Sequence, residues 1–164
     1  MNSTLEITKQ TAPTASAIRW RFLSFDALTS RELYALLQLR SEIFVVEQAC
    51  IFQDLDGSDE AAMHLLGTLD GQIVAYARCF DAGIKYTEAS IGRVVTRDSL
   101  RGTGAGHVLI RECVAAMARQ WRPQPIRIGA QQRLDKFYAQ HGFVQQGVPY
   151  SEDGIAHIEM LRAG

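Results

Sequence analysis

A chain of 164 residues is short enough to form one domain and long enough to bury a sizeable core. Its net charge of −1 gives no overall attraction to nucleic acid or acidic membranes, so any anion site must be local. The three cysteines, Cys50, Cys79 and Cys113, are too scattered for a disulfide framework or a zinc cluster. No stretch approaches the roughly 18 consecutive apolar residues of a membrane span. We therefore expect a cytoplasmic globular protein without nucleic acid or membrane as a partner.

Residues 1–17 are rich in Ser, Thr and Ala and lack the apolar segment of a secretory signal. This composition favours a disordered tail before a single domain of residues 18–164. Apolar and basic residues alternate in "IRWRFL" (18–23), which predicts a half-buried strand. The next segment, "TSRELYALLQLRSEIF" (29–44), predicts a helix, because Thr29 and Glu32 have the spacing of a capping box.

Three strands are expected next. "MHLLGTL" and "QIVAYARCF" flank Asp70 and Gly71, a strong hairpin signal, and "ASIGRVVT" (89–96) is rich in β-branched residues. A helix from residue 104, a strand in "PQPIRIGA" and a short helix in "RLDKFYAQHGF" follow. "FVQQ" and "AHIEML" close the order as strands joined by "VPYSEDG". The order predicts a mixed α/β (α+β) fold with a largely antiparallel front and a βαβα unit behind.

Three glycines stand at alternate positions in "RDSLRGTGAGHVLIREC" (97–113). A P-loop would need a lysine where His107 stands, and a dinucleotide fingerprint would need its third glycine one residue later. Both motifs fail, but unpaired N–H groups at a helix N-terminus still favour an anion, and glycines let a pyrophosphate approach the backbone. The pattern beside Arg101 therefore favours a phosphate site over a tight turn with close helix packing.

The stretch "R-G-T-G-A-G" (101–106) resembles the pyrophosphate loop, [RQ]-x-x-G-x-[GA], of the GNAT superfamily of N-acetyltransferases. The stretch "QQRLDKFYAQHGF" (131–143) resembles the family's second motif, N-x-x-A-x-x-F-Y-x-x-x-G-F. Two motifs in the right order are more specific than either alone. "LYALLQLRSEIFVVEQACIFQDLDGSD" (33–59) is similar to the ElaA-type branch. The resemblance covers residues 18–161 and implies the GNAT fold, a mixed, mostly antiparallel central sheet flanked by helices.

The resemblance implies acetyl-CoA as co-substrate and direct acyl transfer to an amine, with no metal. The strand before the loop would splay from its neighbour and pair its backbone with the pantetheine arm through Val94, Val95 and Thr96. The pyrophosphate would lie on the loop formed by Arg101, Gly102, Thr103, Gly104, Ala105 and Gly106. Gln131 stands where the family has asparagine, and its longer amide would contact the pantetheine arm from a shifted position.

Tyr138 falls at the family's F-Y position, which implies that it protonates the departing thiolate. A phenol stays protonated at neutral pH and suits that role. The alternative is an amphipathic ring whose hydroxyl is satisfied elsewhere. Phe137 and Phe143, its neighbours in the motif, are expected in the core.

The general base is less defined by the sequence. Many family members supply a glutamate on the central strand, near the place of Arg93 here. Glu47 is the first candidate and His64 the second, since imidazole titrates near neutral pH. Glu159, with His157 on the same face of the last strand, and a water chain are further alternatives. Each of these residues also has a structural interpretation, as an ion-pair partner or a buried histidine.

The segment "QDLDGSDE" (53–60) carries Asp54, Asp56, Asp59 and Glu60. Its glycine stands at the wrong position for an EF-hand, so a calcium site is not expected. We expect a solvated loop, with attraction of a cationic amine to the acceptor mouth as the alternative.

Taken together, the sequence predicts an acyl-CoA-dependent N-acyltransferase that acetylates a primary amine of a small molecule or peptide. The alternatives are a catalytically weak acyl-CoA-binding regulatory module and an enzyme of the same fold that uses another acyl-CoA. Because strand edges of such folds often pair, a homodimer is a further expectation.

Overall fold

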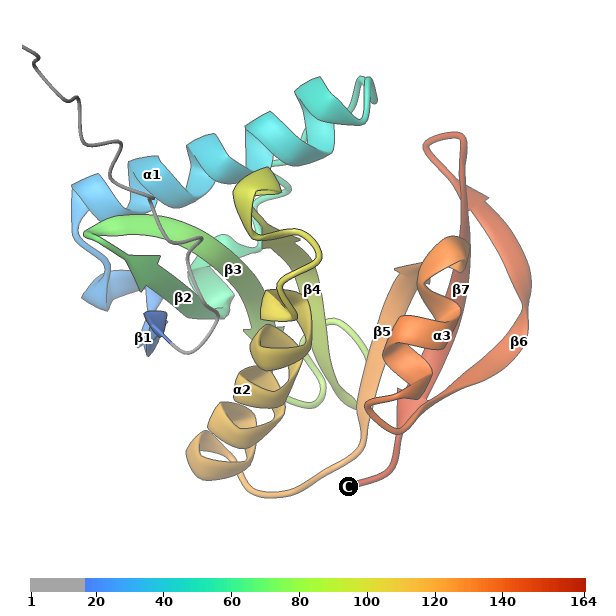
Figure 1. Cartoon of the computed structure of the whole chain (residues 1–164). Helices are drawn as coiled ribbons and strands as arrows, with labels where there is room; N and C mark the ends of the chain where they lie inside the picture. Colours follow the sequence, from blue (N-terminus) through green and yellow to red (C-terminus); the bar gives the residue numbers. More distant parts are fainter. Residues whose placement is uncertain (1–16) are drawn as a thin grey trace, which may run out of the picture.

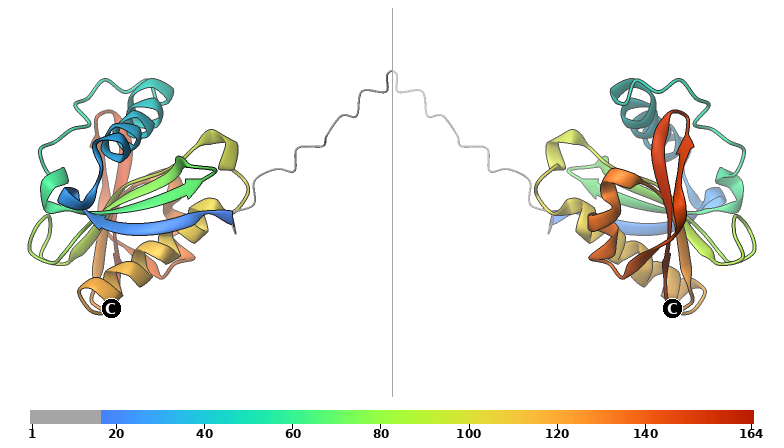
Figure 2. Two further views of the ribbon diagram at one scale, coloured as in Figure 1. Left: turned by 90° about the vertical axis from the view of Figure 1, so that its left-hand side faces the viewer. Right: turned by 90° about the vertical axis from the view of Figure 1, so that its right-hand side faces the viewer.

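The computed structural model describes residues 17–164, so the expected tail lies, up to residue 16, outside the described part. Seven strands of this part form one sheet in the order β1-β2-β3-β4-β5-β7-β6, with helices on both faces (Figures 1 and 2). The strands are β1 (Arg19–Ser24), β2 (Met63–Leu69), β3 (Gln72–Phe80), β4 (Ala89–Thr96), β5 (Ile126–Gln131), β6 (Phe143–Glu152) and β7 (Ile155–Arg162). The predicted mixed α/β class is confirmed.

Strands β1 to β4 pair antiparallel in chain order. Asp70 and Gly71 join β2 to β3, and both have positive φ (50° and 77°), as a type I′ turn requires. The predicted hairpin is therefore confirmed. Along β3, Ala75 and Ala77 join one apolar cluster and Tyr76 joins another, because successive side chains point to opposite faces. Both faces of the sheet are thus apolar and need a cover.

Helix α1 (Ser30–Arg40) covers one face. The Glu32 N–H donates to Thr29 Oγ1 at 3.2 Å, and the Thr29 N–H donates to the Glu32 carboxylate at 2.9 Å. The predicted capping box is confirmed. The helix was expected to run on to residue 44, but the backbone continues instead as the π-helix η3 (Ser41–Glu47). Such π-helical turns are frequent at functional sites.

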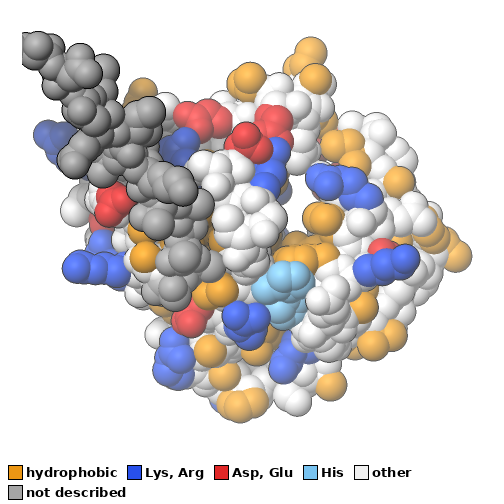
Figure 3. Space-filling model, in the orientation of Figure 1, with side chains coloured by type: hydrophobic (Ala, Val, Ile, Leu, Met, Phe, Trp, Pro, Cys, Tyr) orange, Lys and Arg blue, Asp and Glu red, His pale blue; other side chains and the backbone are white. Residues whose placement is uncertain are grey.

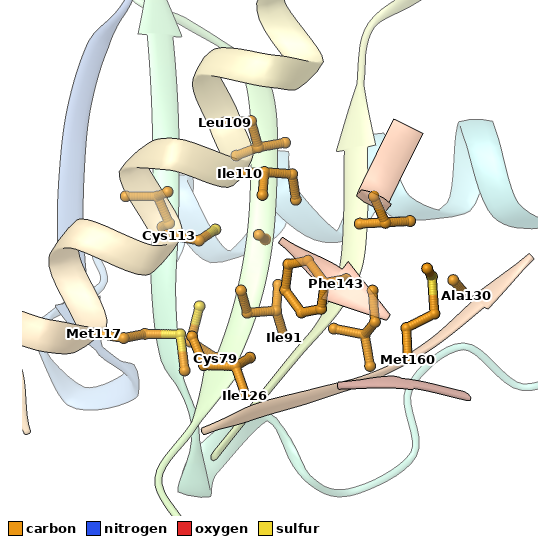
Figure 4. Close-up of a cluster of buried hydrophobic side chains, with 14 of the residues drawn as sticks. Cys79, Ile91, Leu109, Ile110, Cys113, Met117, Ile126, Ala130, Phe143 and Met160 are labelled. Atoms are coloured by element: carbon orange, nitrogen blue, oxygen red, sulfur yellow. The ribbon is translucent and has the colours of Figure 1, made fainter. Parts of the chain in front are cut away.

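Helix α2 (Ala105–Gln120) covers the opposite face, as Figure 2 shows. Leu109, Cys113 and Met117 recur every four residues and pack against the sheet, close to Cys79 and Ile126 (Figure 4). Helix α3 (Asp135–Ala139) is short and ends before Gly142, whose φ of 84° fits the predicted left-handed C-terminal position. No helix in residues 17–164 is long and apolar enough to cross a membrane.

Strands β4 and β5 are parallel neighbours that separate almost at once (Figure 1). Two residue pairs join them, Ala89 with Ile126 and Ser90 with Arg127. Beyond that level β4 has a bulge against β3, and Arg93 takes a positive φ of 50° there. Residues 94–96 therefore have no strand to pair with on their β5 side. The splay that the family resemblance implied is present.

Strand β6 is longer than expected. The segment 148–154 was predicted as a connection, but pairing with β7 resumes at Tyr150 and runs to Glu152, which leaves a turn at Asp153 and Gly154. The reason lies at Gly147, whose φ of 69° allows a register shift between Gln146 and Tyr150. That irregularity accommodates Pro149, which has no N–H to donate.

Candidate active site

The divergence of β4 and β5 opens a cavity of about 620 Å³. Its walls come from β4, β5, the end of η3 with the chain after it, and the turn between β6 and β7. Figure 3 shows the surface hollowed between the segment before α2 and the region of α3, with basic side chains beside the hollow. Of the predicted site residues, Glu47, Val94, Val95, Thr96, Arg101, Gln131 and Tyr138 line this cavity.

The glycine loop presents bare N–H groups at the start of α2. No backbone or side-chain acceptor within the described residues takes the N–H groups of Gly102, Gly104, Ala105 and Gly106. Gly102 and Gly104 have positive φ of 75° and 84°, and nothing lies within 4 Å of a Cβ placed on either. These donors lie at the positive end of a 16-residue helix, which makes the loop a good anion cradle.

Arg101 adds a cation to this loop. In the structure its guanidinium lies 2.5 Å from the Glu47 carboxylate and 3.0 Å from that of Asp98. The side chains of Arg101 and Glu47 are 45% and 41% exposed, so either can exchange its partner for a ligand at little cost. The carboxylate predicted as a general base is thus engaged with the predicted phosphate loop.

Tyr138 lies on α3 with its ring packed edge-on against Phe137 and Phe143, at centroid distances of 5.0 and 5.8 Å. Its side chain is almost fully buried, yet it lines the cavity, and no described residue hydrogen-bonds its hydroxyl. Burial raises the pKa of Tyr138, so the phenol stays protonated at any physiological pH. The geometry leaves this proton free for a ligand in the cavity.

Gln131 extends from the end of β5 across the cavity. Its Nε2 donates to Gln48 Oε1 at 3.1 Å, and its Oε1 accepts from Arg133 Nε at 2.9 Å. The side-chain amide therefore links β5 to the chain after η3. The shorter side chain of asparagine could not make this link from the same position.

His64 does not line the cavity. Its ring is fully buried, with Nδ1 2.7 Å from the Tyr76 hydroxyl and Nε2 2.9 Å from the Asp59 carbonyl oxygen. A carbonyl can only accept, so Nε2 carries the proton and Nδ1 accepts from Tyr76. Burial lowers the pKa of His64, which holds the ring neutral. Both ring nitrogens are used, so the geometry gives His64 a structural role instead of the expected role as a base.

The expectation of a solvated acidic loop is right for Asp56 and Glu60, which are exposed, and wrong for Asp54, which is buried. Asp54 is 4% exposed, and Arg40 is fully buried. Three aspartates pair with three arginines of the helix and the sheet: Arg40 with Asp54 and Asp59 at 2.8 and 2.7 Å, Arg78 with Asp56 and Asp59 at 2.8 and 2.9 Å, and Arg93 with Asp54 at 2.7 Å. Three of the four acidic side chains of the loop are therefore paired with arginines, which weakens the basis for steering a cationic amine.

A known protein family matches the part of the chain that carries these site residues. A model of the acetyltransferase (GNAT) domain matches residues 40–162, which include the splayed strand, the glycine loop and Tyr138. The chain belongs to the GNAT family. It is 40% identical over 147 residues to the protein ElaA of Escherichia coli, with 88% of this chain and 96% of ElaA covered.

Other GNAT relatives agree with this assignment. A UPF0039 protein of Synechocystis is 41% identical over 145 residues, with 88% of this chain and 94% of the relative covered. The crystal structure of an acyl-CoA N-acyltransferase from Pseudomonas aeruginosa matches with a TM-score of 0.84 and 42% identity, covering 88% of this chain and 99% of the other. The predicted GNAT fold and ElaA-like branch are confirmed.

The far end of the GNAT cavity holds residues that the sequence argument did not single out. Tyr86 comes from the connection between β3 and β4, and Tyr150 comes from β6. A Cβ on Gly129 would lie 2.9 Å from the Tyr150 hydroxyl, so the bare glycine gives this phenol its place, whereas the Tyr86 hydroxyl, at 3.7 Å, would be in ordinary contact. Burial, together with the nearby Glu152 carboxylate, raises the pKa of Tyr150 to about 12. The signal in the sequence was Gly129 itself, because a glycine inside a strand often marks a place where another group approaches the backbone closely.

Proposed function

We propose that this protein transfers the acetyl group of acetyl-CoA to a primary amine by direct attack within a ternary complex. One observation carries the proposal: Arg101, which begins the loop of unpaired N–H groups before α2, and Tyr138, whose hydroxyl has no partner among the described residues, line one cavity beside a strand edge without a partner. Coenzyme A offers a pyrophosphate, an arm with two amides and a thiol. Each of these groups has a complementary feature in the cavity or in the loop that begins at its edge with Arg101.

Under this proposal the loop Arg101–Gly106 holds the pyrophosphate through its N–H groups and the Arg101 guanidinium. The backbone of Val94, Val95 and Thr96 pairs with the amides of the pantetheine arm in place of the missing strand. Gln131 contacts the same arm. Support comes from the family and from the relative of Pseudomonas aeruginosa, which is described as an acyl-CoA N-acyltransferase.

The transfer needs two proton movements. The amine nitrogen attacks the thioester carbonyl, the new C–N bond forms, and the C–S bond breaks. The sulfur takes the proton of the Tyr138 hydroxyl, and Tyr138 regains a proton from solvent after the product leaves. The attacking nitrogen gives up its own proton to a base. The new C–N bond joins two substrate atoms, so no acyl-enzyme intermediate is required.

Thiol release from acetyl-CoA tests the proposal. The assay uses a panel of spermidine, glucosamine, tyramine, lysine and a peptide with a free N-terminus, and mass spectrometry identifies the product. The proposal expects thiol release that depends on an amine and matches the acetylated product mole for mole. If coenzyme A binds but neither this panel nor longer acyl-CoAs give turnover, the regulatory module is the correct interpretation. The cytoplasmic location and the homodimer stay predictions.

A further inference from the structure

We infer that His157 is the general base that deprotonates the acceptor amine. This inference rests on the proposed function and deepens it. The chain has four histidines, all within the described residues. His64 uses both ring nitrogens, and His107 and His141 hydrogen-bond each other at 2.9 Å, and none of the three lines the cavity. His157 does line it.

The tautomer of His157 is set by its own strand. Its Nδ1 lies 2.8 Å from the carbonyl oxygen of Ile155. A carbonyl oxygen only accepts, so Nδ1 must carry the proton and donate it. In the neutral ring Nε2 therefore holds a lone pair, and no described residue hydrogen-bonds it. A neutral imidazole with a free, oriented nitrogen is what proton abstraction requires.

The ring is also held in place. Tyr150 on the neighbouring strand β6 stacks on it, with ring centroids 5.9 Å apart and an angle of 29° between the planes. His157 pairs with Tyr150 on one side and with Gln131 of β5 on the other. The side chain is 14% exposed, so the ring is largely fixed yet open to the cavity. Tyr150 acts here as a positioning residue.

Glu152 offers the proton a route from the His157 ring to solvent. The Glu152 carboxylate lies 3.9 Å from Nε2, which is too far for a hydrogen bond but close enough to stabilise an imidazolium. Its side chain is 58% exposed, so it can pass the proton on to water. Other charged or titratable groups that line the cavity include Tyr150 of β6, Asp153 of the β6–β7 turn, Tyr86 and Lys85 of the β3–β4 connection, and Arg133 after β5. Glu159, on the same strand as His157, is paired with Arg127 at 2.7 Å.

Two carboxylates, those of Glu47 and Glu159, compete with His157 for the role of general base. Glu159 is ion-paired with Arg127, and Glu47 lies against Arg101 at the proposed phosphate loop, whereas Nε2 of His157 has no hydrogen-bond partner among the described residues. In the proposed step the amine lone pair attacks the thioester carbonyl while an N–H proton moves to His157 Nε2. The positive charge formed on the ring faces Glu152. Tyr138 supplies the proton to the sulfur, so protons balance over the reaction.

The test compares His157→Gln with His141→Gln, the same change at a histidine outside the cavity. With acetyl-CoA and the best amine of the panel, His157→Gln should lower kcat about a hundredfold to a thousandfold. It should also remove the acid-side inflection of kcat at saturating substrates, with the Kd for coenzyme A and the Tm unchanged. His141→Gln should keep both the rate and the inflection.

A second measurement does not depend on turnover. Spectra of ¹⁵N-histidine-labelled wild-type protein at pH 8, assigned with His157→Gln, should show Nδ1 protonated and Nε2 bare. The inference is overturned if Nε2 carries the proton, or if His157→Gln keeps the inflection or a rate within about threefold of wild type. In the latter case the wild type still turns over and the proposed function stands. A wild type without turnover on any amine overturns both.

Discussion

The carboxylate of Glu47, at the end of the π-helix, lies 2.5 Å from the guanidinium of Arg101, in the loop that precedes α2. The pair joins segments 54 residues apart in the chain. Without a ligand, Glu47 is therefore ion-paired with the Arg101 guanidinium that we assign to pyrophosphate binding. A bound pyrophosphate has to share or replace it.

The first prediction follows from this competition. Glu47→Gln removes one of the two carboxylates paired with Arg101 and leaves Asp98. It should lower the Kd for coenzyme A by up to about fivefold, since an exposed ion pair contributes about 0–1 kcal/mol. Arg101→Ala should raise this Kd about tenfold, because a hydrogen bond to a charged group is lost. Isothermal titration measures both, and pantetheine, which has no phosphate, is the control ligand. A similar effect on pantetheine binding would contradict this role of Arg101.

The second prediction contrasts two glycines of the loop. Gly106→Ala should leave the Tm unchanged or raise it, because its Cβ would lie at an ordinary 3.5 Å from Phe137 and alanine favours a helix. It should still weaken coenzyme A binding by placing a methyl group in the cradle. Gly104→Ala should in addition lower stability by about 1 kcal/mol, because its φ of 84° is strained for alanine. Unchanged coenzyme A binding by both variants would rule out the cradle.

The third prediction concerns Tyr138. Tyr138→Phe should lower kcat about a hundredfold, because the proton for the departing sulfur is lost. The Tm should hardly change, because no described residue hydrogen-bonds the hydroxyl and its removal leaves no protein group unpaired. Steady-state kinetics and thermal melting give the two values. A kcat close to that of wild type would show that the thiolate leaves without Tyr138.

The fourth prediction is a two-stage loss of stability in acid. Burial lowers the folded-state pKa of His64, so the unfolded chain binds more protons and stability falls as the pH drops below about 6.5. The hydrogen bond from Arg78 lowers the pKa of Asp56. Burial tends to raise the pKa of Asp59, but hydrogen bonds from Arg40 and Arg78 outweigh it and lower the pKa. Stability from these carboxylates is lost below about pH 4.

Urea unfolding at pH 7.5, 5.5 and 3.5 measures this loss, and Asp59→Asn should flatten its lower stage while costing stability at pH 7.5. A midpoint that stays constant from pH 7.5 to 5.5 would contradict the buried neutral state of His64.

Local features of the fold could be predicted from the sequence because the residues that decide them are neighbours. The Thr29–Glu32 box and the Asp70-Gly71 turn need only a few adjacent side chains. The loop at residues 101–106 was found for the same reason. Its phosphate partner could be argued from glycine spacing and the helix terminus before any tertiary contact was known.

Features that depend on distant partners were missed. Asp54 and Arg93 are 39 positions apart, and an acidic stretch does not indicate which arginine will pair with it in the fold. A usable signal existed on the other side: Arg78 and Arg93 stand inside apolar strands, where a buried cation needs a carboxylate. The extension of β6 was hidden because Pro149 suggests a strand end, whereas the irregular register after Gln146 absorbs it.

A crystal structure with acetyl-CoA bound tests the central claim most directly. The account predicts the pyrophosphate within hydrogen-bond distance of the N–H groups of residues 102–106. It also predicts the pantetheine amides paired with the backbone of residues 94–96, and the sulfur next to the Tyr138 hydroxyl. A coenzyme A that binds outside the cleft between β4 and β5, or whose sulfur points away from Tyr138, would contradict it.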